Sequence, residues 1–318
     1  MVRLAVVGIA LVSLVASNAA AAFPGENGRI AVGFSGGCIK TMKPDGTGLR
    51  GLIGCERFTR TGVMPEWSPD GRRLLFLRTD ATMPFDQLGH PAVMAADGSR
   101  QRLVRLAPEP PFLYDSKPSF APDGRQFLFT RGPSSGAPRP EIWKATTAGR
   151  GERRLRAGRL PRWSPDGATI AYVHPMRYAG RTGLVNARTG KRIRWVAPEV
   201  SSLDWSPDGR WLVYSPSVCC PDVYTDLFAV RADGQGPRRR LTRTRRWAEG
   251  QAVWSPNGRR IAFVRWVLDE GGEFARYQIL TMNRAGSDRR LIYDAGDMAI
   301  EEIDLDSGIT LSWGPRRG

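Results

Sequence analysis

One five-residue stretch has the pattern of a serine nucleophile. Gly33-Phe34-Ser35-Gly36-Gly37 matches G-x-S-x-G, with which serine hydrolases hold the attacking hydroxyl at a sharp turn between a strand and a helix. The next segment, Cys38-Ile39-Lys40-Thr41-Met42, has instead the pattern of a strand that leads into a hairpin turn. We therefore predict no catalytic role for Ser35, and the sequence offers no other credible catalytic set.

Histidines and carboxylates are the remaining groups that could do acid–base or metal chemistry. Both histidines, His90 and His174, fall in predicted loops that share one face. Carboxylates gather in two clusters, Asp269, Glu270 and Glu273, and Glu301, Glu302, Asp304 and Asp306. The alternating Asp304 and Asp306 could supply oxygen ligands to Ca²⁺, although the full calcium-loop pattern is missing. We predict no metal site and no cofactor, and keep Ca²⁺ at Asp304 and Asp306 as the alternative.

Aromatic and basic residues are mixed in several predicted loops. Trp, Tyr and Arg are the common anchors of protein interfaces, and the same mixture suits sugar stacking or an anionic polymer. Alternatively, Trp247 and Trp266 pack beneath their loops and have only a structural role. The candidate binding residues are Arg177, Tyr178, Arg245, Arg246, Trp247 and Trp266.

The four cysteines allow more than one pairing. Cys38 and Cys55 lie on either side of a hairpin turn signal, Lys43-Pro44-Asp45-Gly46, so a cross-strand disulfide is one interpretation. The adjacent Cys219 and Cys220 permit a vicinal disulfide or two separate thiols. The close C-x-x-C spacing that is typical of metal-binding cysteines is missing.

These candidates must be positioned by a repeated element. A five-residue pattern returns five times: Trp67-Ser68-Pro69-Asp70-Gly71, Phe120-Ala121-Pro122-Asp123-Gly124, Trp163-Ser164-Pro165-Asp166-Gly167, Trp205-Ser206-Pro207-Asp208-Gly209 and Trp254-Ser255-Pro256-Asn257-Gly258. Pro fixes φ for the first corner of a type I turn, Asp or Asn suits the second, and Gly takes the left-handed position that follows. Each copy therefore predicts a tight hairpin between two antiparallel strands.

The spacing of the copies predicts the number of repeats. With Pro24 as the first equivalent position and Trp313 as the last, the repeats begin at 24, 67, 120, 163, 205 and 254, and periods of this length indicate propeller blades. The first repeat lacks its opening strand, and residues 309–315 supply a strand of that kind. We therefore predict an all-β, six-bladed propeller of four-stranded antiparallel blades, closed by the C-terminal strand that completes the first blade.

Strand order places the loops on opposite faces of the predicted disc. In each blade we name the strands A to D from the inside outwards, so the tight A–B and C–D turns share one face. The B–C and D–A connections share the other, the long-loop face, and loops on a rigid frame usually carry binding residues. The longest predicted B–C connections are 79–90, 131–141, 215–224 and 265–276. Basic pairs near strand D, such as Arg153-Arg154, would blunt an exposed edge.

The repeats resemble those of the WD40-like (PD40) propellers of the TolB family, whose units carry W-S-P-D-G, an I-A-F strand and an A-D-G turn. In this chain the same features are Trp254 to Gly258 with Asn for Asp, Ile261-Ala262-Phe263, and Ala232-Asp233-Gly234. The resemblance covers roughly residues 23–316. It implies a six-bladed propeller outside the cytoplasm that serves as a protein-binding platform.

The N-terminal segment predicts that the chain leaves the cytoplasm. Arg3, the apolar run Leu4 to Ala16 and the small residues up to Ala22 have the pattern of a secretory signal peptide, which is too short to span a bilayer. We expect cleavage near Ala22, with residues 1–22 as signal peptide and 23–318 as the propeller. The net charge of +16 suits an acidic partner, although a solvated basic surface is the simpler explanation.

Together these features predict a secreted or periplasmic, non-catalytic propeller that binds a protein or an anionic envelope polymer through its long-loop face. The alternative is an extracytoplasmic enzyme, a glycan lyase or hydrolase, whose site lies at the channel mouth and uses loop carboxylates with His90 or His174. We expect a monomer and no nucleic-acid partner, since the sequence lacks a recognised nucleic-acid-binding module.

Overall fold

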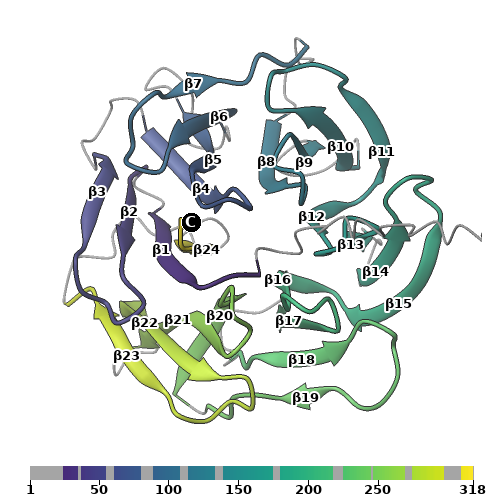
Figure 1. Ribbon diagram of the computed structural model, residues 1–318. Helices are drawn as coiled ribbons and strands as arrows, with labels where there is room; N and C mark the ends of the chain where they lie inside the picture. Colours follow the sequence, from purple (N-terminus) through teal and green to yellow (C-terminus); the bar gives the residue numbers. More distant parts are fainter. Residues whose placement is uncertain are drawn as a thin grey trace, which may run out of the picture.

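The computed structural model describes residues 24–34, 37–54, 61–79, 89–107, 114–132, 139–174, 180–217, 225–244, 246–268, 274–296 and 309–317. These residues form six four-stranded antiparallel sheets arranged as a ring around a central axis (Figure 1). No helix occurs among them. The predicted six-bladed, all-β propeller is therefore confirmed.

We number the blades I to VI and give their strands from the channel outwards. Blades I and II consist of β24 (Ile309–Pro315), β1 (Asn27–Phe34), β2 (Ile39–Met42) and β3 (Arg50–Ile53), and of β4 (Thr61–Trp67), β5 (Arg73–Thr79), β6 (His90–Ala95) and β7 (Arg102–Leu103). Blades III and IV consist of β8 (Tyr114–Phe120), β9 (Gln126–Gly132), β10 (Glu141–Thr146) and β11 (Arg153–Ala157), and of β12 (Arg159–Trp163), β13 (Thr169–His174), β14 (Arg181–Asn186) and β15 (Arg192–Pro198). Blades V and VI consist of β16 (Val200–Trp205), β17 (Trp211–Pro216), β18 (Phe228–Arg231) and β19 (Arg239–Arg240), and of β20 (Trp247–Trp254), β21 (Arg260–Leu268), β22 (Phe274–Asn283) and β23 (Arg290–Asp294).

The repeated pentapeptide forms the predicted turn. In blade II the N–H of Gly71 donates to the carbonyl of Ser68 at 2.9 Å, and Gly71 has a φ of 63°. The Asp70 carboxylate accepts from the Ser68 hydroxyl at 2.5 Å and from the N–H of Arg72 at 3.0 Å. Ser164 with Asp166, Ser206 with Asp208 and Ser255 with Asn257 repeat the side-chain bond. The turn is therefore fixed locally, by its own side chains.

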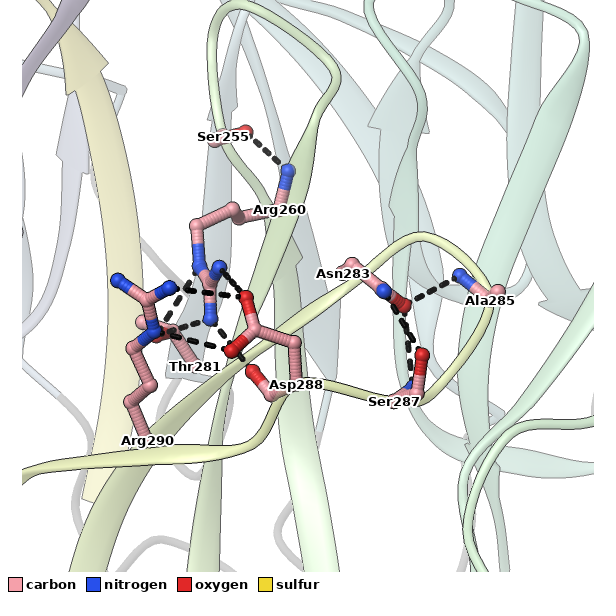
Figure 2. A network of polar contacts seen from close by, with 8 residues as sticks. All are labelled: Ser255, Arg260, Thr281, Asn283, Ala285, Ser287, Asp288 and Arg290. Carbon is pink, nitrogen blue, oxygen red and sulfur yellow. Dashed lines mark hydrogen bonds and ion pairs between the residues drawn. The ribbon is translucent and has the colours of Figure 1, made fainter.

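A polar network links the two tight turns of blade VI (Figure 2). The backbone N–H of Arg260 donates to Ser255 Oγ in the A–B turn, while its guanidinium reaches Thr281 on β22 and Asp288 in the C–D turn. Blade I uses the same device, because Arg29 at the start of its strand B donates to Thr41 Oγ1 and to the carbonyl of Gly48. Arginine thus braces the tight-turn face.

The hydrophobic core lies between the blades. The second strand of each blade is covered on both sides, and Leu74, Leu75, Phe76 and Leu77 of β5 are fully buried. Leu75 packs in one cluster with Phe120, Phe127 and Phe129 of blade III. This arrangement explains the nearly continuous apolar runs in these strands.

Strand β24 closes the ring, as predicted. It pairs with β1 in an antiparallel register that joins Ile30 to Trp313 and Gly33 to Thr310. Ser312 Oγ also accepts a hydrogen bond from the N–H of Trp67 in blade II, at 3.0 Å. Gly314 lies directly against the Trp67 indole, since a Cβ at residue 314 would fall 2.4 Å from Trp67 Cγ.

Several predicted loops are in fact partly strand. Strands β21 and β22 extend into the predicted B–C loop 265–276, where Val267 pairs with Arg276. His90 begins β6 and His174 ends β13, so their assignment to loops was wrong. The G-x-S-x-G stretch begins within β1, at Gly33 and Phe34, and the antiparallel strand β2 follows it in the sequence. Ser35 and Gly36 are outside the described residues. Each of these segments has its partner strand beside it, and backbone pairing extends the ladder.

Ring closure yields a stability prediction. The substitution Gly314→Ala should lower the free energy of unfolding by about 1–3 kcal/mol or more, because the added methyl group overlaps the Trp67 indole. Urea unfolding monitored by tryptophan fluorescence measures this. The control Gly51→Ala lies on the exposed strand β3, where nothing is within 4 Å of the added methyl group, and should leave stability unchanged or slightly higher. Equal stability of the two variants would contradict close packing at Gly314.

Candidate functional site

The central channel is narrow and is lined by the innermost strands. In blades II to VI each of these strands contains a β-bulge, at 63–66, 116–119, 159–162, 200–202 and 250–253. A β-bulge interrupts the regular alternation of side chains between the two faces of a strand, so it changes the direction in which a side chain points. The bulge residues Met64, Lys117, Leu160, Ser201 and Gln251 all line a cavity of about 30 Å³. This volume holds a water or two and is too small for a sugar ring.

Three charged side chains meet near this channel. Glu66, Arg162 and Asp204 come from blades II, IV and V, and each directly precedes the aromatic residue of its repeat. Arg162 Nη1 lies 3.6 Å from Glu66 Oε2 and donates to the carbonyl of Pro118 at 3.3 Å. The arginine therefore lies close to groups on blades II and III at once.

The two carboxylates also connect neighbouring blades. Glu66 Oε1 accepts the N–H of Phe120 at 3.2 Å, and Asp204 Oδ2 accepts the N–H of Trp254 at 2.8 Å. Ser312 of blade I accepts the N–H of Trp67 of blade II in the same way. In blades I, II and V the residue before the aromatic position thus binds the backbone of the next blade. These groups hold the ring together, which limits their freedom to act as acids or bases on a substrate.

Burial changes the proton affinity of both carboxylates. Desolvation raises the pKa of Glu66, against the opposing effect of the Arg162 charge. Desolvation also raises the pKa of Asp204 to about 7, while the hydrogen bond from Trp254 opposes it. Asp204 remains partly exposed, so water reaches part of its side chain.

The long-loop face holds a second charged arrangement. In blade VI the fully buried Glu249 accepts two hydrogen bonds from Arg265, at 2.9 and 2.7 Å. The guanidinium of Arg265 lies over the Trp247 ring, 4.1 Å from its centroid. In blade III, Arg131 pairs with Asp115 and Glu152 at the equivalent position. These buried pairs stabilise the long-loop end of the strands. In blade VI the pair also fixes the Trp247 ring.

The predicted binding residues have different surroundings. Trp247 is partly buried at the start of β20, next to the exposed Arg246. Trp266 lies on β21 rather than in a loop, paired with Ala248, and packs against the core shared by blades I and VI. The assignment of both tryptophans to loops was therefore wrong, while their part in binding stays a prediction. Arg177, Tyr178, Arg245, Asp304 and Asp306 lie outside the described residues.

The metal and cysteine predictions stay largely untested. Within the described ranges, no group of three or more His, Cys, Asp or Glu side chains could hold a metal ion. Cys38 is disulfide-bonded. The other three cysteines are outside the described part of the chain, so the pairing of Cys38 with Cys55 remains a prediction. No helix in the described residues is long and apolar enough to cross a membrane.

The sequence did not single out Glu66, Arg162 and Asp204. A usable signal was present, because the residue before the aromatic position varies from copy to copy: Glu66, Ser119, Arg162, Asp204, Val253 and Ser312. In a half-buried strand one would expect apolar residues at an inward position. Polar residues there indicate a specific bond. Glu66 and Asp204 bond to the next blade, whereas Arg162 bonds to the preceding one.

The pKa of Asp204 yields a pH prediction. Since it is raised from 3.8 to about 7 in the folded protein, the native state binds a proton between these values that the unfolded chain has released. This stabilisation is complete below pH 3.8 and is lost as the pH rises through 7. Asp204→Asn should therefore be more stable than wild type at pH 8, and the difference should shrink toward pH 4.

Unfolding in urea across this pH range measures the difference. The difference in the free energy of unfolding should change with pH by less than about 1.4 kcal/mol per pH unit, the value for one full proton, since water reaches part of the Asp204 side chain. The control Ser312→Ala removes the same kind of bond without a titrating group, and its difference from wild type should not depend on pH. A pH-independent difference for Asp204→Asn would contradict the raised pKa.

Comparison with known proteins agrees with this architecture. No protein-family model and no curated protein sequence matches the chain. Among solved structures, TolB from Acinetobacter baumannii is similar with a TM-score of 0.69 and 18% identity, over 92% of this chain and 68% of that one. A protein assigned as TolB from Agrobacterium tumefaciens has a TM-score of 0.62 and 18% identity, over 91% and 99%. An oligogalacturonate lyase in complex with manganese is more distant, with a TM-score of 0.51 and 13% identity, over 81% and 71%. The chain thus has the six-bladed propeller fold of the TolB-type structures.

Proposed function

We propose that this protein is an extracytoplasmic, non-catalytic propeller that binds a protein or an envelope polymer through its long-loop face. The observation that carries the proposal is the arrangement around Trp247. Its ring is held by Arg265, which is held in turn by the buried Glu249, and the exposed Arg246 lies beside it. An aromatic side chain next to a free arginine is a common anchor of interfaces.

The buried pair gives Trp247 a fixed position before any partner arrives. A side chain that is already ordered loses little conformational entropy on binding, so more of its contact energy appears as affinity. Removing only one member of a buried ion pair typically costs about 3–5 kcal/mol. Loss of either Glu249 or Arg265 would therefore disturb the structure that holds Trp247. We assign these two residues a structural role and no contact with the partner.

The arrangement of the channel favours binding over catalysis. Glu66 and Asp204 are engaged by the backbone of neighbouring blades, and the cavity that Glu66 helps to line has a volume of about 30 Å³. An enzyme of the lyase or hydrolase class would need carboxylates within reach of a bound sugar. An extracytoplasmic location is supported by the signal-peptide pattern of residues 1–22.

The long-loop face can be tested with a pair of matched double variants. Arg246→Ala with Trp247→Ala removes the anchor, while Arg210→Ala with Trp211→Ala removes the same residue types from the tight-turn face. The mature protein and both variants are used to capture material from the cell-envelope fraction of the source organism. Captured proteins are identified by mass spectrometry and captured polymers by sugar analysis.

We expect a specific partner that binds wild type and the Arg210 and Trp211 variant alike. Its free energy of binding to the Arg246→Ala, Trp247→Ala variant should be weaker by at least about 2 kcal/mol, as is usual for an anchor of this kind. Thermal unfolding verifies that both variants fold. Capture of the same material by all three proteins, or of none by wild type, would contradict the proposal.

A further inference from the structure

The outer edges of blades IV and V carry an unusual excess of positive charge. Between Asp166 and Glu199 the sequence has six basic residues and no acidic one, and between Asp233 and Glu249 it has six arginines and no acidic residue. Strands β15 and β18 of these blades are neighbours in the ring (Figure 1). We call their exposed, described basic side chains the basic rim: Arg181, Arg188, Lys191, Arg192, Arg194, Arg238, Arg239 and Arg243.

Nearby acidic side chains do not neutralise the basic rim. Glu199 pairs with Arg159, Asp226 with Arg240, and Asp233 with Arg231. In the part of the chain that the structure describes, Arg181 and Arg238 form no ion pair with a carboxylate. Arg238 lies over the Phe228 ring and contacts the Tyr214 hydroxyl, and neither contact neutralises its charge. Both guanidinium groups can therefore attract an anion from outside.

A groove in the basic rim has an apolar floor. It is formed by Trp195, Val196, Ala197 and Pro198 of β15, and Arg181 of blade IV and Arg238 of blade V also line it. Its volume is about 610 Å³, within the range of about 300–1,000 Å³ that is usual for small-molecule sites. Cations from two blades therefore border one apolar surface.

Trp195 orients the arginines around it. The guanidinium carbon of Arg192 lies 4.8 Å from the centre of its ring, and that of Arg181 lies 5.8 Å away. The ring rests on Gly183, where a Cβ would come within 2.9 Å of Trp195 Cε3. Stacking on an aromatic ring restricts a guanidinium without neutralising it, so it stays free to bind a carboxylate with two parallel hydrogen bonds.

We propose that this groove binds a polysaccharide whose sugar rings carry carboxylates. The carboxylates would pair with Arg181 and Arg238, while the C–H face of a sugar ring would pack on Val196, Ala197 and Pro198. The apolar floor favours this ligand over a polymer of phosphates, which offers no apolar face. The groove is formed by residues of blades IV and V, whereas Trp247 belongs to blade VI, so this proposal and the proposed function can fail independently.

The test compares three polymers of defined chemistry by titration calorimetry with the mature protein. Polygalacturonate carries the sugar ring and the carboxylate, dextran carries only the ring, and poly-glutamate carries only the carboxylate on a peptide chain. Arg181→Gln with Arg238→Gln removes the two groove cations. The control Arg72→Gln with Arg125→Gln removes the same charge from exposed residues of the tight-turn face.

We expect polygalacturonate to bind more tightly than poly-glutamate of equal charge, and dextran not to bind. The groove variant should bind polygalacturonate at least about tenfold more weakly, since it loses the charge-assisted hydrogen bonds to the sugar carboxylates. Trp195→Leu keeps the floor apolar but should also weaken binding, because Arg181 loses the ring that orients it. The control variant and the Arg246 and Trp247 variant should bind as wild type does.

Three results would overturn the proposal. Equal weakening in the groove variant and its control would show that net charge alone attracts the polymer. Equal or tighter binding of poly-glutamate would identify a site for an acidic peptide. No measurable binding of polygalacturonate by the wild-type protein would show that the groove does not bind such a polysaccharide.

Discussion

The pairing of β24 with β1 is the constraint on which the remaining structure depends. It joins residues about 280 positions apart, such as Ile30 and Trp313, and gives blade I the innermost strand that every other blade receives from its own repeat. The hydrogen bond from Trp67 to Ser312 and the contact of Gly314 with the Trp67 indole then lock blade I to blade II. Because each core lies between two blades, a break at one point would expose apolar surface on both sides of it.

Arginine has two distinct roles in this ring. Some arginines are bound within the protein, as Arg260 is by Asp288 and Arg265 by Glu249, and these stiffen the two faces. Others, such as Arg181 and Arg238, border a groove and lack a carboxylate partner among the described residues. The net charge of +16 by itself does not separate the two groups. Only the surroundings of each guanidinium show which of them can meet a ligand.

The blades could be predicted from sequence because their turns are local. Ser68, Asp70 and Gly71 make all the bonds that fix their turn, so each copy of the pentapeptide marks one hairpin. Strands β20, β21 and β22 continue into segments that were predicted as loops. This could not be predicted, because backbone pairing such as that of Trp266 with Ala248 depends on a neighbouring strand. The charges of Glu66, Arg162 and Asp204 were missed for a related reason. Their bonds reach across blades, which no pattern within one repeat reveals.

The bulges of the channel wall have an energetic consequence. Met64, Lys117, Leu160 and Gln251 adopt φ values of 50–54°, a left-handed conformation that costs a residue other than glycine on the order of 1–2 kcal/mol. Glycine at these positions would relieve the strain, yet the chain carries larger side chains at all four. The strain is offset where the side chain is buried, as Met64 and Leu160 are, since a glycine there would lose that packing.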